Sequence, residues 1–168
     1  LDSVDLSAAQ DHGVAVLNTP EAPAQAVAEL TMGLMLSLLR QINQIDQAVR
    51  KGEWPRLQGR LLAAQTVGII GIGHIGRRVA KLCQAFEAKV IAHDPFAAQV
   101  PQGVTLMPLE KLLASADIIT LHLPYTPQTH HLLDRKSFAS LKSEAIIINA
   151  ARGGLIDECA LAEALNSG

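Results

Sequence analysis

Four short, continuous apolar runs recur along the chain and are separated by stretches of mixed polarity. The runs are Val67–Ile70, Lys89–Ala92, Ile118–Leu121 and Ala145–Ile148. Continuous apolarity, without alternation, is typical of strands that a parallel sheet buries on both faces. Helical patterns at 77–82 and 109–113 lie between the runs, and a weaker strand is expected at Val104–Leu106. The pattern therefore predicts an α/β protein with a doubly wound parallel sheet and flanking helices.

A long helical pattern extends from Pro23 to about Arg50. Apolar residues recur near one face at Val27, Leu30, Leu34, Leu38, Ile45 and Val49, and Thr31, Met35, Leu39 and Ile42 widen that face. Such a face is broader than a helix covering a single core needs, so we expect it to meet two domains or a second subunit. Before it, residues 1–20 are expected to form a short helix ending at Gly13 and a strand at Val14–Leu17.

A glycine-rich turn directly follows the first predicted strand. Its three glycines make the pattern GxGxxG, at Gly71, Gly73 and Gly76. In a dinucleotide-binding turn the first glycine permits the tight bend, the second admits the pyrophosphate, and the third lets the next helix pack on the strand. The backbone N–H groups of His74 and Ile75 would then point at phosphate from the positive end of the helix predicted at 75–86. An ordinary glycine-rich turn is the alternative.

Asp94 supports the dinucleotide interpretation because it ends the second predicted strand. It follows Gly76 at close to the ~20-residue spacing expected of the acid that binds the ribose hydroxyls. A carboxylate there repels the 2′-phosphate of NADP, and residues 95–98 contain no Arg or Lys to attract one. The two features together predict a Rossmann-type site with NAD as the cofactor. The alternative for Asp94 alone is a turn residue before Pro95.

Two further segments are expected at the carboxyl edge of the sheet, where ligands of such folds bind. In the segment at 122–129, Leu123 and Pro124 are candidates for an apolar wall against an adenine or nicotinamide ring, and Thr129 is a further cofactor-binding candidate. A plain strand-end loop is the alternative.

The second segment spans residues 149–158. Its small residues Ala150 and Ala151 would let a ligand lie against the backbone, and both are cofactor-binding candidates. Arg152 offers a planar guanidinium that suits a carboxylate. A surface arginine in a salt bridge is the alternative.

Composition narrows the expected partners. The chain has 168 residues, 49% of them apolar and 18% charged, with a formal net charge of −2. This balance excludes a disordered segment and gives no electrostatic reason to expect nucleic acid or a membrane surface. No apolar run approaches the ~18–20 residues that span a bilayer, and no metal-ligand pattern accompanies the histidines. The low charge predicts that another domain or subunit covers part of the surface.

The two cysteines indicate the cellular compartment. Cys83 and Cys159 lie in predicted helices without CxxC spacing, which favours reduced, buried thiols in a cytoplasmic protein.

The chain begins at Leu1 and ends at Gly168, and its first methionine is Met32. We therefore expect it to be a piece of a longer protein.

In their order and spacing, these segments resemble the D-isomer-specific 2-hydroxyacid dehydrogenases, in particular the group of phosphoglycerate dehydrogenases and glyoxylate/hydroxypyruvate reductases. The resemblance extends over essentially the whole chain. It rests on residues 18–20, 26–30, 66–76, 93–95, 122–126 and 148–154. One departure is Glu87, where the family usually has glycine, and there we expect a local loop change with little functional effect.

The resemblance implies a two-domain subunit with the NAD-binding domain inserted into a flavodoxin-like substrate domain. Residues 1–20 would be the tail of the first substrate-domain segment and 21–168 the NAD-binding domain. The helix at 23–50 would lie at the junction and in a homodimer contact. Arg152 would be catalytic and also line the cofactor site, gripping the carboxylate of a D-2-hydroxy or 2-oxo acid, while NAD(H) carries the hydride.

The resemblance also implies what this chain lacks. In the family a histidine exchanges the substrate proton and a glutamate orients that histidine. Both lie downstream, and none of the six histidines here matches that histidine. We therefore expect the 168-residue chain to bind NAD without turnover. A second class stays open, that of non-catalytic, NAD-sensing proteins similar to the C-terminal-binding-protein corepressors. The particular 2-hydroxy acid is not predicted.

Overall fold

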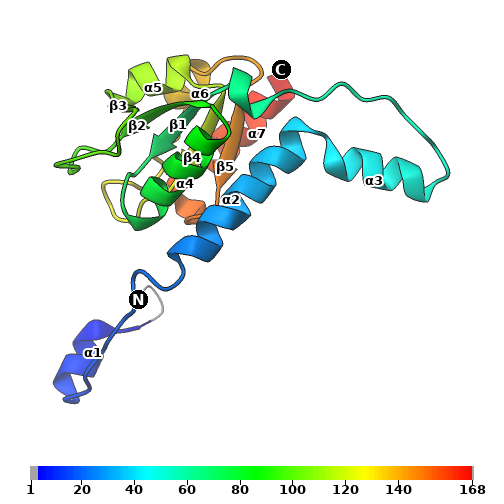
Figure 1. The fold of residues 1–168 in the computed structure, drawn as a ribbon. Helices are drawn as coiled ribbons and strands as arrows, with labels where there is room; N and C mark the ends of the chain where they lie inside the picture. Colours follow the sequence, from blue (N-terminus) through cyan, green and yellow to red (C-terminus); the bar gives the residue numbers. More distant parts are fainter. Residues whose placement is uncertain (1–3, 168) are drawn as a thin grey trace.

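The computed structural model describes residues 4–167 and centres on a five-stranded parallel sheet, shown in Figure 1. The strands are β1 (Thr66–Ile70), β2 (Lys89–His93), β3 (Val104–Leu106), β4 (Ile118–Leu121) and β5 (Ile146–Asn149). Their order across the sheet is β3-β2-β1-β4-β5. Strands β2 and β3 therefore follow β1 on one side, and the chain then crosses to the other side of β1, where β4 and β5 lie. The predicted Rossmann-type sheet is confirmed.

Five helices cover the two faces of this sheet (Figure 1), namely α2 (Ala24–Leu39), α4 (His74–Ala85), α5 (Leu109–Ser115), α6 (Arg135–Ala139) and α7 (Glu158–Ser167). Helices α1 (Leu6–Asp11) and α3 (Ile42–Arg50) lie away from it, and two 3-10 turns are η1 (Leu62–Ala64) and η2 (Gly153–Leu155). Each predicted strand at 67–148 matches its observed counterpart to within one residue at either end. The apolar runs are continuous because α2 and α4 bury one face of the sheet while α5 to α7 bury the other.

The helix predicted from Pro23 to Arg50 is wrong in its continuity, because α2 and α3 are separate helices. Gln41 lies between them with a left-handed φ of 53°. Its Nε2 donates a hydrogen bond to the Gln58 carbonyl at 2.9 Å, which ties the break to the returning chain. The apolar periodicity continues across the break, so the pattern carried no sign of it.

The broad apolar face predicted for this region divides into two parts in α2. Thr31, Met35 and Leu39 are buried against α4 and the sheet. The other part remains exposed, with Leu30, Leu34 and Leu38 at 56%, 39% and 50% exposure. In α3, no residue is buried. This side of the molecule therefore presents an apolar surface that the described chain does not cover.

Residues 4–20 lie apart from the sheet (Figure 1). The predicted short helix is confirmed as α1, and Gly13 follows it with a φ of 66°. The predicted strand at Val14–Leu17 is wrong. Within residues 4–20 no strand forms, because no neighbouring strand offers a partner there, and Leu17 is 92% exposed. Residues 1–3 and 168 of the predicted domains lie outside the described residues, and the division at residue 20 stays a prediction.

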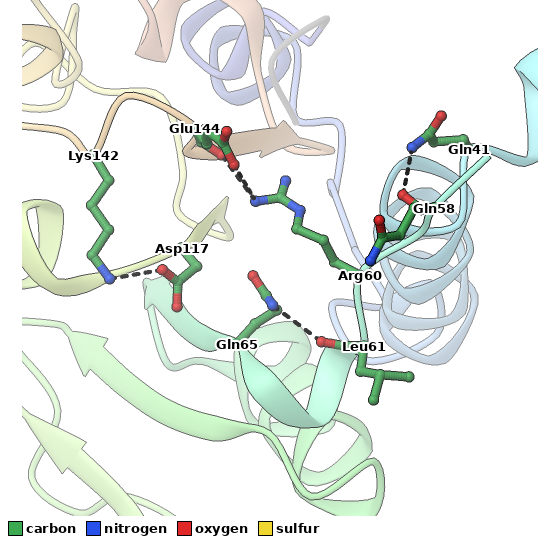
Figure 2. Close-up of polar contacts among 8 residues, drawn as sticks. All are labelled: Gln41, Gln58, Arg60, Leu61, Gln65, Asp117, Lys142 and Glu144. Atoms are coloured by element: carbon green, nitrogen blue, oxygen red, sulfur yellow. Dashed lines mark hydrogen bonds and ion pairs between the residues drawn. The ribbon is translucent and has the colours of Figure 1, made fainter.

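After α3, residues 51–61 return to the amino edge of the sheet, opposite the glycine-rich turn (Figure 1). Figure 2 shows how this end is fixed, with the Arg60 guanidinium 3.6 Å from the Glu144 carboxylate. Beside it, Lys142 Nζ donates to Asp117 Oδ1 at 2.7 Å. Partial burial works to raise the pKa of Asp117, but its hydrogen bonds from Lys142 and the Thr66 backbone outweigh that effect and lower it.

Two sequence features have clear outcomes in α4 and α7. Cys83 is buried in α4, where desolvation raises the pKa of its thiol to about 12, whereas the expectation of burial is wrong for Cys159, which is exposed. Glu87 ends α4 in a left-handed conformation with φ 63°, and its N–H donates to the Gln84 carbonyl at 2.9 Å. Among the described helices, none has the length and apolarity needed to cross a membrane.

Candidate functional site

The glycine-rich turn joins the carboxyl end of β1 to α4, and each glycine has a distinct surrounding. Gly71 has a φ of 91°, and a Cβ there would lie 2.5 Å from the His122 carbonyl oxygen. A Cβ at Gly76 would collide with the Gly71 carbonyl oxygen, whereas a Cβ at Gly73 would meet nothing within 4 Å. The turn thus needs Gly71 and Gly76 for its own packing and leaves open space at Gly73 for an approaching group.

The first turn of α4 faces that open space with unpaired donors. Gly73 is its N-cap and His74 its first residue. As the first residues of the helix, His74 and Ile75 have N–H groups without intrahelical acceptors. The helix dipole adds positive potential at the same end. This arrangement suits a phosphate group, and phosphate binding by these two N–H groups stays a prediction. The His74 ring also lies 3.5 Å from the Glu21 carboxylate.

Asp94 follows β2 and lies beside the glycine-rich turn. Its Oδ2 accepts a hydrogen bond from the Ile72 N–H and its Oδ1 accepts one from the Phe96 N–H, both at 2.9 Å. The Gly71 N–H in turn donates to the His93 carbonyl at 2.9 Å. The predicted ribose-binding carboxylate is therefore positioned by, and itself fixes, the turn that would hold the pyrophosphate.

The loop after β4 lies across the glycine-rich turn. The His122 N–H donates to the Ile70 carbonyl at 2.8 Å, and Leu123 contacts the cluster that covers the other sheet face. Pro124 is exposed. The Thr129 hydroxyl donates to the Pro124 carbonyl at 2.8 Å, so this predicted cofactor-binding side chain stabilises the loop itself.

His122 is the one described residue with a buried side-chain polar atom that has no hydrogen-bond partner. Its Nε2 lies 2.9 Å from the Thr120 hydroxyl, while its Nδ1 is buried and unpartnered. Burial lowers the pKa of the imidazole to about 4, so the ring is neutral near pH 7. The loop therefore brings a neutral, half-satisfied imidazole to the strand end next to Gly71.

The loop after β5 carries Arg152 on an exposed, extended backbone with φ −142° and ψ 138°. The Asn149 side chain contacts this loop twice, accepting from the Ala151 N–H at 3.1 Å and donating to the Arg152 carbonyl at 2.8 Å. Arg152 Nη1 donates to the Ala151 carbonyl at 2.9 Å. Ala150 is half-buried between these groups and β5.

The two loops also contact each other. A Cβ at Gly154 would lie 2.6 Å from Tyr125 Cε2, and the His131 N–H donates to the Gly154 carbonyl at 2.9 Å. The Tyr125 hydroxyl lies 3.0 Å from His130 Nδ1. The loop after β4 is thus docked on the loop that carries Arg152, so the two are positioned as one unit.

All candidate residues named from the sequence lie on segments at the carboxyl edge of the sheet. The glycine-rich turn and Asp94 are joined directly, and the loops of Leu123 and Arg152 are joined through Tyr125. β1 and β4 are neighbours at the point where the strand order reverses, which is where dinucleotides bind in doubly wound sheets. Open space at Gly73, free N–H groups on α4 and the orphaned His122 Nδ1 fit a dinucleotide there.

Sequence reasoning missed three groups that build the candidate site. The Asn149 side chain, the Tyr125 ring and the Ile72 N–H received no role, although each lies within a motif that was singled out. Their roles depend on hydrogen bonds or ring contacts between loops, which residue type and spacing do not reveal. Only the glycine pair at 153–154 hinted that a neighbouring group approaches this backbone closely.

Fold and site define a Rossmann-type dinucleotide-binding domain. Residues 32–168 match the family model described as "D-isomer specific 2-hydroxyacid dehydrogenase, NAD binding domain", and the chain belongs to this family. The resemblance stated from the motifs is confirmed, and with it NAD as the family's cofactor.

The chain is similar to named oxidoreductases over its whole length. It is 45% identical to a D-3-phosphoglycerate dehydrogenase of Methanocaldococcus jannaschii and 44% identical to a hydroxypyruvate reductase of Thermotoga maritima; both alignments cover 100% of the chain, but 33% and 56% of those proteins. The D-lactate dehydrogenase of Aquifex aeolicus, solved with NAD and lactic acid, superposes with a TM-score of 0.89 at 32% identity, covering 100% of this chain and 52% of that one. The chain thus spans a third to about half of these relatives.

Proposed function

We propose that the protein carrying this chain transfers a hydride between NAD(H) and a D-2-hydroxy acid or its 2-oxo acid. The chain supplies the dinucleotide site and Arg152 as the anchor for the substrate carboxylate. The observation that carries this proposal is the docking of the Arg152 loop on the loop after β4, through Gly154 and Tyr125, beside the glycine-rich turn. Cofactor and acid can then be held in one geometry, as hydride transfer requires.

Each group has a separate task at this edge. The N–H groups of His74 and Ile75 bind the pyrophosphate that Gly73 admits, and Asp94 accepts hydrogen bonds from the ribose hydroxyls. Leu123 and Pro124 form an apolar wall for a ring of the cofactor. When bound, NAD(H) supplies the hydride chemistry. Arg152 grips the carboxylate through parallel N–H···O bonds.

Asp94 sets the preference for NAD over NADP in this proposal. Its carboxylate is fixed beside the turn by two backbone N–H groups and would repel a 2′-phosphate. The segment that follows it at 95–98 holds no basic residue to offset this repulsion.

A screen of the full-length protein tests the function. Reduction of 3-phosphohydroxypyruvate, hydroxypyruvate, glyoxylate and pyruvate is followed by loss of NADH absorbance, with NADPH in parallel. We expect turnover of at least one 2-oxo acid with NADH, and a loss of about a hundredfold in kcat/KM on Arg152→Ala, because a charge-assisted bidentate contact is removed. Binding of NADH without turnover of any acid would overturn the proposal and favour the binding-only class.

We infer further that the protein forms a homodimer through the exposed apolar face of α2 and α3. Leu34 and Leu38 of α2 and Val49 of α3 are 39%, 50% and 45% exposed, although all are large apolar residues. Large apolar residues exposed on two successive helices indicate an interaction surface. In light scattering of the full-length protein, Leu38→Glu is expected to shift the mass from dimer to monomer. Leu106→Glu, at a residue that is 40% exposed on the edge strand β3, is expected to leave the mass unchanged.

The cytoplasm is the proposed location. Both cysteines are free thiols, and Cys159 is exposed to solvent. An exposed free thiol favours a reducing compartment. Fractionation of cells that produce the full-length protein tests this directly, since recovery in a membrane or secreted fraction would contradict it.

A further inference from the structure

We propose that Asn149 is a positioning residue that fixes the backbone of Arg152 and thereby the grip on the substrate carboxylate. This inference rests on the proposed function and deepens it, because it assigns the precision of carboxylate binding to a side chain that does not itself touch substrate.

The Asn149 side chain makes two hydrogen bonds to the backbone of the Arg152 loop. Asn149 is the last residue of β5 and lies opposite Leu121 of β4. Its Oδ1 accepts a hydrogen bond from the Ala151 N–H at 3.1 Å, and its Nδ2 donates to the Arg152 carbonyl at 2.8 Å. One planar side chain therefore holds a donor and an acceptor of two successive residues.

Only an amide satisfies both contacts. A carboxylate of the same shape accepts from the Ala151 N–H but has no hydrogen for the Arg152 carbonyl. An aliphatic side chain satisfies neither contact. The opposite senses of the two hydrogen bonds also fix which end of the amide carries oxygen, so Asn149 has one orientation in which it fits.

These two hydrogen bonds fix the backbone conformation of Arg152 and with it the direction of its side chain. The Arg152 carbonyl also accepts the Leu155 N–H at 3.3 Å, so Asn149 and the following 3-10 turn hold the same peptide group from two sides. Tyr125 and His131 support the far end of the loop at Gly154. Without Asn149, the near end of the loop loses the two hydrogen bonds that hold the Ala151 N–H and the Arg152 carbonyl in place, and the guanidinium samples more orientations.

The strand itself does not need the Asn149 side chain. The backbone of β5 pairs with β4 along Ile146–Asn149, and Ile148 supplies the buried contact at this end. Asn149→Ala is therefore expected to leave the sheet and the glycine-rich turn intact. This separates a positioning role from a general effect on folding.

The experiment is a double-mutant cycle in the full-length protein, using the 2-oxo acid that the wild type reduces best. Asn149→Ala is expected to raise KM for the acid about tenfold, with a smaller change in kcat, and to leave the Kd for NADH within about twofold. Asn149→Asp keeps the acceptor for Ala151 but opposes the Arg152 carbonyl, so it is expected to raise KM at least as much. In an Arg152→Ala background, Asn149→Ala is expected to change kcat/KM less than about twofold, because no guanidinium remains to be placed.

The outcomes are distinguishable. Equal losses in both backgrounds, or a parallel loss of NADH affinity, would show that Asn149 acts elsewhere and overturn this inference while the proposed function stands. A wild-type protein that reduces no 2-oxo acid removes the reaction, and with it the role assigned to Asn149. A tenfold rise in KM that appears when Arg152 is present and disappears in the Arg152→Ala variant supports both the proposed function and the role of Asn149.

Discussion

Asp94 Oδ2 accepts the Ile72 N–H at 2.9 Å, which joins the end of β2 to the glycine-rich turn after β1. The carboxylate proposed to bind the ribose is therefore part of the same hydrogen-bonded unit as the turn proposed to bind the pyrophosphate. Its second oxygen is held by the Phe96 N–H. Each oxygen of a carboxylate can accept a further hydrogen bond, so these contacts leave capacity for the two ribose hydroxyls.

Asp94→Ala is therefore expected to weaken NAD binding by more than the ribose contacts alone. The substitution removes the two hydroxyl contacts and also frees the Ile72 N–H, so the turn is less well ordered before the cofactor arrives. At roughly 1 kcal/mol for each of the two lost ribose contacts, the Kd for NAD rises about 30-fold. The less ordered turn adds to this, so we expect a rise of more than about 30-fold, and the preference over NADP to shrink. Isothermal titration with both cofactors measures this.

A matched control exists at Asp134, which also caps a backbone N–H, accepting from Ser137 at 2.8 Å at the start of α6. Asp134→Ala, like Asp94→Ala, removes a hydrogen bond to a backbone N–H and is expected to lower the free energy of unfolding. It is expected to leave the Kd for NAD unchanged. An unchanged Kd in Asp94→Ala would contradict the role of Asp94.

Substitution by alanine is expected to destabilise the protein at Gly154 and to have little effect at the adjacent Gly153. A Cβ at Gly153 would meet nothing within 4 Å, whereas a Cβ at Gly154 would lie 2.6 Å from the Tyr125 ring. Gly154→Ala should displace Tyr125, lower the free energy of unfolding by about 1–2 kcal/mol and raise KM for the acid. Gly153→Ala should change the free energy of unfolding by less than about 0.5 kcal/mol.

Urea unfolding measures both variants, and Tyr125→Ala supplies the test of cause. If the clash with the ring is responsible, Gly154→Ala costs little in a Tyr125→Ala background. Additive losses in the double variant would show that Gly154 is required for another reason.

Much of this architecture was predictable because its causes are local. Strands such as Ile118–Leu121 are buried on both faces, so their residues are continuously apolar, and the glycine-rich turn needs its residue types for steric reasons. The break at Gln41 and the lack of a strand at Val14–Leu17 were not predictable. Both involve distant parts of the chain, since Gln41 bonds to the Gln58 carbonyl at the break and a strand at 14–17 would need a neighbouring strand as partner.

The candidate site divides in the same way. Asp94 was identified by its spacing from the glycine-rich turn, and Arg152 by a guanidinium that suits a carboxylate beside small residues. Asn149 and Tyr125 were not, because an amide and a ring are common in loops and their tasks come from contacts between two loops. Sequence patterns thus indicate the groups expected to meet the ligands, whereas the groups that hold them in place need three-dimensional geometry.

The free energy of unfolding is expected to depend on His122 between pH 6.5 and 4. Burial lowers the pKa of the folded imidazole from 6.5 to about 4. Between these values the unfolded chain binds a proton that the folded chain does not, so stability is fully present above pH 6.5 and is lost as the pH falls toward 4. The difference corresponds to roughly 3 kcal/mol.

His122→Gln should remove this part of the pH dependence, which is measured as the difference between the urea-unfolding free energies of wild type and variant at pH 7 and pH 4.5. His12→Gln, at an exposed position after α1, is the matched control and should leave the profile as it is in the wild type. A His122→Gln profile parallel to that of the wild type would show that the imidazole is hydrated when folded.

The left-handed backbone at Glu87 is expected to destabilise the fold. Glu87→Gly is therefore expected to raise the free energy of unfolding. Its φ of 63° lies in the left-handed region, where a Cβ costs roughly 1–2 kcal/mol. The greater freedom of glycine in the unfolded chain offsets part of that gain, so we expect a net increase of about 0.5–1 kcal/mol. Glu87→Ala separates backbone strain from charge, because alanine removes the carboxylate but keeps the Cβ.

Urea unfolding distinguishes the two causes. If Glu87→Ala stabilises the protein as much as Glu87→Gly does, the carboxylate rather than the backbone is the cause. If only glycine stabilises, the C-terminal turn of α4 keeps a left-handed conformation that Glu87 tolerates at a cost.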